Sequence, residues 1–107
     1  MAWAVLAVAG LFEVVWAFAM KQSAGFTRLW PSLVTLGAMA VSFALLAWSM
    51  RVLPLGTAYA VWTGIGALGA FVVGILFLGE SANPLRLLAA AMILGGLVLM
   101  KLASSDG

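Results

Sequence analysis

Long apolar stretches, separated by short polar turns, account for nearly the whole chain. They cover about residues 2–20, 31–50, 57–78 and 85–102. Each stretch has about the 20 residues that an α-helix needs to cross the hydrocarbon core of a membrane. The pattern therefore predicts an all-α membrane protein, with a single domain over residues 1–107 that contains four transmembrane helices.

The turns between the stretches contain residues that end and begin helices. Pro54 and Gly56 lie in "RVLPLG", between the second and third stretches. In "GESANP", Asn83 is suited to cap the last helix and Pro84 to open it. The last helix is about 25 Å long up to Lys101, slightly less than a core of about 30 Å, but the lysine side chain can extend to the interface. We therefore expect it to span the membrane too.

Composition excludes several classes of protein. Of 107 residues, 66% are hydrophobic and 7% are charged, which leaves no room for a water-soluble domain. The chain has no cysteine and no histidine, so it lacks the means for disulfides and the commonest metal ligands, and we expect no metal site. A net charge of +2 is too small to indicate nucleic-acid binding, and there is no ATP-binding "GxxxxGK" motif. We expect no enzyme and no cofactor.

Glu13 is the only acidic residue within any predicted span, since Glu80 and Asp106 lie outside the spans. It lies 10 residues after Trp3 and 8 before Lys21, about 15 Å and about 12 Å along a helix, and is therefore near the midplane. A charge there costs at least about 3 kcal/mol on insertion scales. Intramembrane carboxylates usually mark an ion or proton pathway. The alternative is a protonated glutamate that joins two helices by a hydrogen bond.

Small, aromatic and hydroxyl-bearing side chains accompany this carboxylate. Gly10 and Trp16 lie three positions from Glu13 on the same face, the first clearing space and the second supplying an aromatic wall with an N–H donor. On the second span, Ser42 is also near the midplane, in a heptad-spaced stripe of hydroxyl side chains that can line a polar seam. The alternative for Ser42 is a hydrogen bond to a carbonyl of its own helix.

Two aromatic residues on the third span complete the set. Tyr59 and Trp62 are three positions apart and point the same way, unless they belong to an interfacial aromatic belt. A carboxylate, aromatic faces and hydroxyls together suit an organic cation, which binds through charge, cation–π attraction and hydrogen bonds. The pattern thus favours a cation site at Glu13. Its candidate shell is Gly10, Trp16, Ser42, Tyr59 and Trp62.

Glycines mark two further candidate features. Gly64, Gly66 and Gly69 lie in "TGIGALGAFVVG", where they predict either a bend that lets the third helix deform during transport or a static packing groove. Gly95 and Gly96 lie in "AAAMILGGLVLM" and offer a small-residue face for close helix packing. This last face is our candidate for a dimer contact.

Several motifs together resemble the small multidrug resistance family. They are "FEVVWAFAMK", "GFTRLWPS", "LPLGTAYAVWTGIGALGA" and "LGESANP", with Ser42 in its expected place. The resemblance extends over essentially the whole chain, from about Ala2 to Leu102, without insertions. Within the family, "EVVWA" and "GTAYAVWTGIGA" are similar to the guanidinium-exporter subtype, whereas the multidrug branch usually has a small residue at the position of Trp16.

The resemblance implies an antiparallel, dual-topology homodimer in the bacterial inner membrane, in which each protomer contributes Glu13 to one shared site. It also implies a proton-coupled antiporter, which is driven by the proton gradient and needs no cofactor. Glu13 would bind substrate and proton, and the glycines from Gly64 to Gly69 would be the deformable part of the third helix. The surrounding shell would be Trp16, Ser42, Tyr59 and Trp62.

The basic residues do not favour one orientation in the membrane. With four spans, Arg51 and Lys101 fall on one side and Lys21, Arg28 and Arg86 on the other, a difference of one residue. Four short helices also cannot enclose a cation path and shield a midplane carboxylate from lipid, whereas two inverted copies can. We therefore expect insertion in both orientations and an antiparallel homodimer.

Two classes of function remain open from the sequence. The first is a proton-coupled exporter of guanidinium and small guanidino cations, with a broad exporter of quaternary ammonium and other lipophilic cations as the alternative within transport. Trp16 argues against the broad exporter because a large ring beside Glu13 narrows the site. The second class is a membrane regulatory or assembly subunit in which Glu13 only joins the subunits of an oligomer.

Overall fold

The computed structural model describes residues 1–103, so Asp106 lies outside the described residues. This described part of the chain contains four α-helices: α1 (Ala2–Gln22), α2 (Leu29–Ser49), α3 (Leu55–Phe77) and α4 (Pro84–Ala103). Their ends lie within two residues of the boundaries expected from the sequence. Each helix is long and apolar enough to cross a membrane, with a mean hydropathy of 1.8 to 2.1 over an 18-residue window. The expected all-α, four-span architecture is therefore confirmed.

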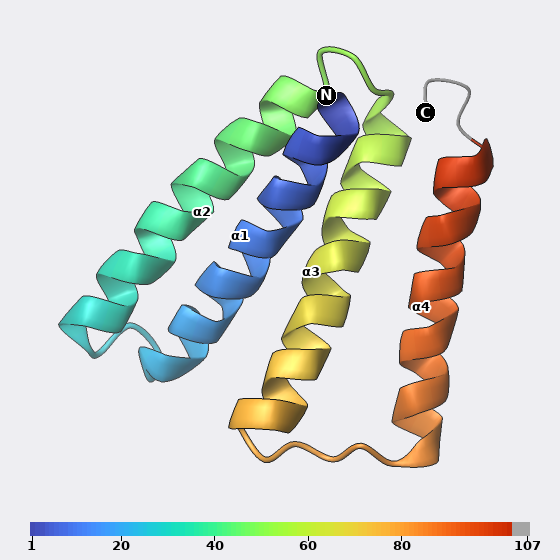
Figure 1. Ribbon diagram of the computed structural model, residues 1–107. Helices are drawn as coiled ribbons and strands as arrows, with labels where there is room; N and C mark the ends of the chain where they lie inside the picture. The colour runs from blue at the N-terminus through green and yellow to red at the C-terminus, as the bar shows by residue number, and fades with distance from the viewer. Residues whose placement is uncertain (104–107) are drawn as a thin grey trace.

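The helices stand side by side in the order α2, α1, α3, α4 (Figure 1). The molecule is flat, measuring 43 × 34 × 17 Å along its principal axes. The N-terminus, the α2–α3 turn and the end of α4 lie at one end of the slab, and the other two turns lie at the opposite end. In this arrangement α1 is central and contacts both α2 and α3, whereas α4 packs along α3.

The interface between α1 and α2 is built from small and hydroxyl-bearing residues. The buried residues of α2 repeat every three or four positions and form one stripe, namely Thr35, Ala38, Ser42, Leu46 and Ser49. On α1, Ala9 is buried, and its carbonyl accepts a hydrogen bond from the Ser42 hydroxyl. Small side chains let transmembrane helices approach closely, which provides packing where lipid supplies no hydrophobic driving force between helices. The hydroxyl stripe predicted from the sequence thus lies in a helix–helix contact.

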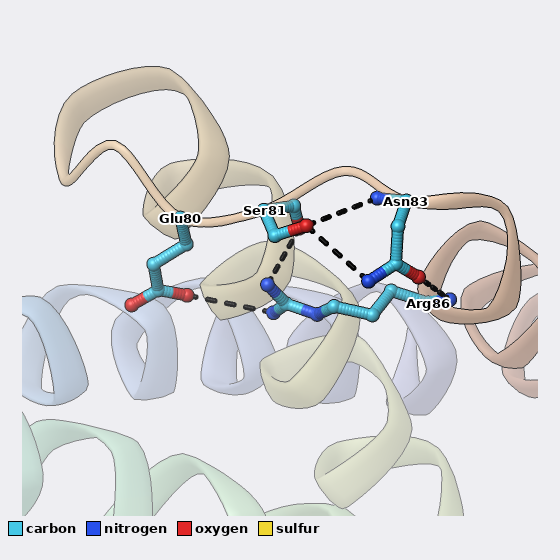
Figure 2. Close-up of polar contacts among 4 residues, drawn as sticks. All are labelled: Glu80, Ser81, Asn83 and Arg86. Atoms are coloured by element: carbon cyan, nitrogen blue, oxygen red, sulfur yellow. Dashed lines mark hydrogen bonds and ion pairs between the residues drawn. The ribbon is translucent and has the colours of Figure 1, made fainter.

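The outermost helix, α4, contributes no buried residue within the described part of the chain. It is joined to α3 by a turn in which Gly79 has a positive φ of 68° and the Glu80 N–H donates to the Gly74 carbonyl at 3.0 Å. The Asn83 side-chain oxygen accepts a hydrogen bond from the Arg86 N–H at 3.0 Å (Figure 2). Asn83 is therefore the N-cap of α4, as the sequence predicted, and it sets where the last helix begins.

Candidate functional site

The Glu13 carboxylate lies between α1 and α3, where it contacts Gly66. A Cβ atom built at Gly66 would overlap Glu13 Oε1, so only a glycine leaves room for this side chain. Glu13 Oε1 is buried and has no hydrogen-bond partner among residues 1–103. An intramembrane carboxylate oxygen without a partner has a strong need for a donor or a proton. Glu13 therefore has the acceptor capacity that a cation site requires.

A line of aromatic rings runs from α1, the helix that carries Glu13, through α2 to α3. The Trp16 and Phe43 rings meet edge to face at 6.3 Å, and Phe43 and Trp62 do so at 5.6 Å. The centroids of the Trp62 and Tyr59 rings are 5.5 Å apart, and the two ring planes make an angle of 47°. Such contacts stabilise ring pairs and present π-faces to a cation. The rings expected around the site are thus brought into one continuous series.

Phe43 lies between Trp16 and Trp62 in this series, and the sequence pattern did not predict its role. Phe43 follows Ser42 directly, so a helical pattern assigns it to a different face of α2 from the hydroxyl stripe. Its side chain nevertheless reaches the rings of Trp16 and Trp62. An aromatic residue adjacent to a mid-membrane serine is the only signal in the sequence that points to it.

Ser42 joins three helices through its hydroxyl. It donates to the Ala9 carbonyl of α1 at 2.7 Å and accepts from the Trp62 indole N–H of α3 at 2.9 Å. Ser42 is thus bonded across helices, not to its own helix as the alternative had it. Trp62 is buried, unlike a residue of an interfacial belt, while Tyr59 is 52% exposed in this single protomer. These two hydrogen bonds hold the Trp62 ring in a defined position.

The glycines singled out from the sequence have different surroundings. Gly10 is packed against Ile65 of α3, so the space beside Gly10 is occupied by that side chain. Gly64 faces Leu97 of α4, and Gly69 faces Val14 of α1. The α3 helix continues unbroken through all of its central glycines. In this conformation these residues are contact points between helices, and deformation of α3 stays a prediction.

Gly95 and Gly96 lie on an open face of α4. No other atom of the described residues is within 4 Å of a Cβ built at either position. Most of the helix is also exposed, including Leu88, Met92 and Leu99, whereas Leu97 and Met100 are partly buried against the core. The predicted role of the two glycines in a dimer contact therefore requires a second chain on this face.

Two grooves adjoin the Glu13 region. One, of about 360 Å³, lies between α1 and α3 and extends from Val14 to Lys21, Glu80 and Arg86. The other, of about 460 Å³, is lined only by apolar residues, among them Phe18 and Phe77. Within residues 1–103 there is no cluster of acidic side chains that could hold a metal ion.

Fold and site together define a class of protein: a small four-span membrane protein with one midplane carboxylate and an aromatic wall. The chain belongs to the Small Multidrug Resistance family, whose sequence profile, described as Small Multidrug Resistance protein, matches residues 1–93. Four spans and this membership place it in the bacterial inner membrane as a multi-pass protein.

Bacterial relatives match almost the whole chain. A protein of Citrobacter freundii named "Guanidinium exporter" is 60% identical over 104 residues, which are 97% of this chain and 99% of the relative. A protein of Escherichia coli strain K12 with the same name is 59% identical over the same coverage. A third such relative, from Salmonella typhimurium, is 60% identical.

Proposed function

We propose that this protein is a proton-coupled antiporter that exports guanidinium and small guanidino cations across the bacterial inner membrane. The observation that carries the proposal is the buried oxygen of Glu13, which has no hydrogen-bond partner among residues 1–103. Aromatic rings on α1, α2 and α3 form one connected series, which includes Trp16 on the same helix as Glu13. Guanidinium is planar, has only donors and matches a carboxylate in a bidentate fork. The names of the relatives support the same substrate.

Competition at one carboxylate provides the coupling. Glu13 binds either a proton or the cation, because each neutralises the same charge. Arrival of protons from the acidic side therefore releases guanidinium there, and loss of the proton on the other side prepares the site for the next cation. Such an exchange uses the proton gradient directly and requires no cofactor.

The surrounding side chains orient the carboxylate and the substrate. The Trp16 indole N–H is buried and has no acceptor among residues 1–103. Guanidinium carries only donors and therefore cannot accept a hydrogen bond from the Trp16 indole N–H. In this proposal the acceptor for that N–H is the Glu13 carboxylate, which lies on the same face of the helix. Ser42 holds the Trp62 ring, which packs between the rings of Phe43 and Tyr59 in the aromatic wall. Trp16 and Ser42 thereby restrict the site to slim, planar cations.

An antiparallel homodimer completes the site in this proposal. One protomer is a slab only 17 Å thick along its shortest axis, which cannot surround a cation path on all sides. The α4 face around Gly95 and Gly96 is open, and Tyr59 is largely exposed. A second, inverted copy covers these surfaces and makes the inward- and outward-open states near-equivalent. Both copies of Glu13 then face one shared site.

The test is guanidinium-driven proton movement in liposomes that contain the purified protein. We expect Glu13→Gln to abolish it while the protein remains inserted and dimeric, because Gln binds neither a proton nor a cation by charge. Glu13→Asp should retain part of the activity with a shifted pH profile, since the carboxylate moves by only one methylene. Normal exchange by the Gln variant would exclude the mechanism.

Selectivity provides a separate check on the substrate. The native protein should export guanidinium far better than bulky tetraphenylphosphonium-like cations, and Trp16→Gly should widen the range at the expense of guanidinium. Equal export of both cations by the native protein would instead indicate a broad multidrug exporter.

A further inference from the structure

The guanidinium group of Arg86, in the first turn of α4, is bound by residues of the α3–α4 turn and of α3 (Figure 2). Arg86 Nη2 is 3.5 Å from Glu80 Oε1, and Arg86 Nη1 donates to the Ser81 carbonyl. The centre of the guanidinium lies 4.9 Å from the centroid of the Phe71 ring. A carboxylate, a carbonyl and an aromatic face thus hold one planar cation, which is a general recognition set for guanidinium.

The position of this carboxylate is set by the backbone as well as by Arg86. Glu80 follows the left-handed Gly79, and its N–H is bonded to the Gly74 carbonyl at 3.0 Å. Its carboxylate lies against Gly74, where a Cβ would overlap it. The carboxylate therefore has a defined location that does not depend on the Arg86 side chain alone.

The same residues lie at the rim of the groove between α1 and α3. Glu80, Arg86 and Phe71 line this groove of about 360 Å³, together with Val14, the chain neighbour of Glu13. Val14 and Lys21, which also lines the groove, are seven residues apart, or about 10 Å along α1. The groove thus extends from the turn to Val14, the residue that follows Glu13 on α1, and Glu13 itself is not among its lining residues.

We propose that Glu80, the Ser81 carbonyl and Phe71 form a second guanidinium-binding site at the rim, which Arg86 fills as a tethered competitor until a free guanidinium displaces it. The inference rests on the proposed function for its substrate class. A cation captured at the rim enters the groove that leads toward Glu13. The positive charge of Lys21 in the same groove weakens capture and favours onward release.

Displacement is feasible because the ion pair is exposed. The Arg86 and Glu80 side chains are 36% and 43% exposed, and exposed pairs contribute little stability. A group on a short flexible tether has an effective concentration in about the millimolar range. Free guanidinium therefore competes with Arg86 at millimolar concentrations, which suits a low-affinity capture site.

The experiment measures binding in full-length protein that lacks the midplane carboxylate. In a Glu13→Gln background in lipid bicelles, guanidinium chloride is titrated at constant ionic strength, and the amide NMR shifts of Gly79 and Glu80 are followed. Adding Arg86→Gln should give saturable shifts at millimolar guanidinium, and restoring Arg86 should raise the half-saturating concentration by about tenfold. Adding Glu80→Gln to the Arg86→Gln protein should abolish the shifts.

A further variant tests the rim site without changing any residue of the α3–α4 turn. Phe71→Leu keeps the turn residues and the apolar packing but removes the π-face, so it should weaken binding severalfold in the Arg86→Gln protein. Unsaturable shifts in that protein, or equal shifts with and without Glu80, would overturn the rim site. Guanidinium exchange by the native protein without rim binding would refute this inference alone. Rim binding without exchange would refute the proposed function and leave the rim site standing.

Discussion

The Ser42 hydroxyl links three helices in this protein. It bonds the Ala9 carbonyl of α1 and the Trp62 indole of α3 from its place on α2. Other hydroxyls of the same stripe are used differently, since Thr35 and Ser49 donate to Pro31 and Leu45 of their own helix. The chemical group is the same at each position, and only the neighbouring helix distinguishes their roles.

We predict that Ser42→Ala destabilises the protein by about 1–2 kcal/mol and lowers guanidinium affinity, because the buried Trp62 N–H loses its acceptor. Unfolding in mixed micelles and guanidinium binding measure the two effects. The matched control is Ser49→Ala, which removes a bond within one helix and should change both quantities less. Equal effects of the two substitutions would contradict the assigned role of Ser42.

Gly66 provides a second prediction at the scale of the residue. A methyl group there would overlap the Glu13 carboxylate, so Gly66→Ala must displace that side chain. Overpacking costs about 1–3 kcal/mol of stability, and the displaced carboxylate should bind guanidinium at least severalfold more weakly. Binding and proton-flux assays test this.

Gly37→Ala is the control for Gly66→Ala. Within the described residues, no atom lies near a Cβ built at Gly37, so the added methyl group meets open space. This variant should bind and exchange guanidinium normally. If the two variants behave alike, close contact between Gly66 and Glu13 is not what holds the carboxylate.

At the scale of the element, α4 depends on few contacts. Leu97 lies against Gly64 of α3, and the Lys101 ammonium lies 4.7 Å from the centroid of the Trp3 ring on α1. The start of α4 is secured by Asn83, whose side chain caps the helix. Because α4 buries no residue in the described protomer, its cap and its turn have a large share in positioning it.

We predict that Asn83→Ala destabilises the start of α4 by about 1 kcal/mol, because the Arg86 amide loses its acceptor. Hydrogen exchange at the Arg86 amide should accelerate accordingly. Asn83→Asp keeps an oxygen at the capping position and should retain protection. The same loss of protection in both variants would exclude the cap as the cause.

At the scale of the whole molecule, the proposed pairing with an inverted copy rests on the flat shape of the protomer and on its balanced charges. The protomer leaves large apolar residues exposed along α4, such as Leu88, Met92 and Leu99. Lys21, Arg28 and Arg86 at one end oppose Arg51 and Lys101 at the other, so neither end is strongly favoured in the cytoplasm.

We predict that single cysteines placed in the first turn, residues 23–28, react from outside intact cells in roughly half of the molecules. The natural chain contains no cysteine, so labelling reports only the introduced site. Two added lysines in that turn should drive the population to one orientation. Uniform labelling of the protein without added lysines would refute dual topology and the shared site with it.

The class of fold could be predicted from the amino-acid pattern alone, and the same pattern singles out Glu13. Hydropathy, span length and turn residues are local properties, so the four helices and the Asn83 cap could be predicted closely. The midplane depth of Glu13 follows from the rise per residue and the positions of flanking residues. Membership of the family could also be predicted from the sequence, because the motifs that indicate it are contiguous in the chain.

How the helix faces meet could not be predicted from the sequence and is seen first in the folded protein. The Ser42 bond to α1, the contact of Gly66 with Glu13 and the position of Phe43 between two tryptophans all join residues of different helices. Helical periodicity tells which residues share a face, but nearly every face of a transmembrane helix is apolar, so the pattern does not tell which neighbour it contacts. That information arises from packing of the small residues against one another, and it exists only once the helices are side by side.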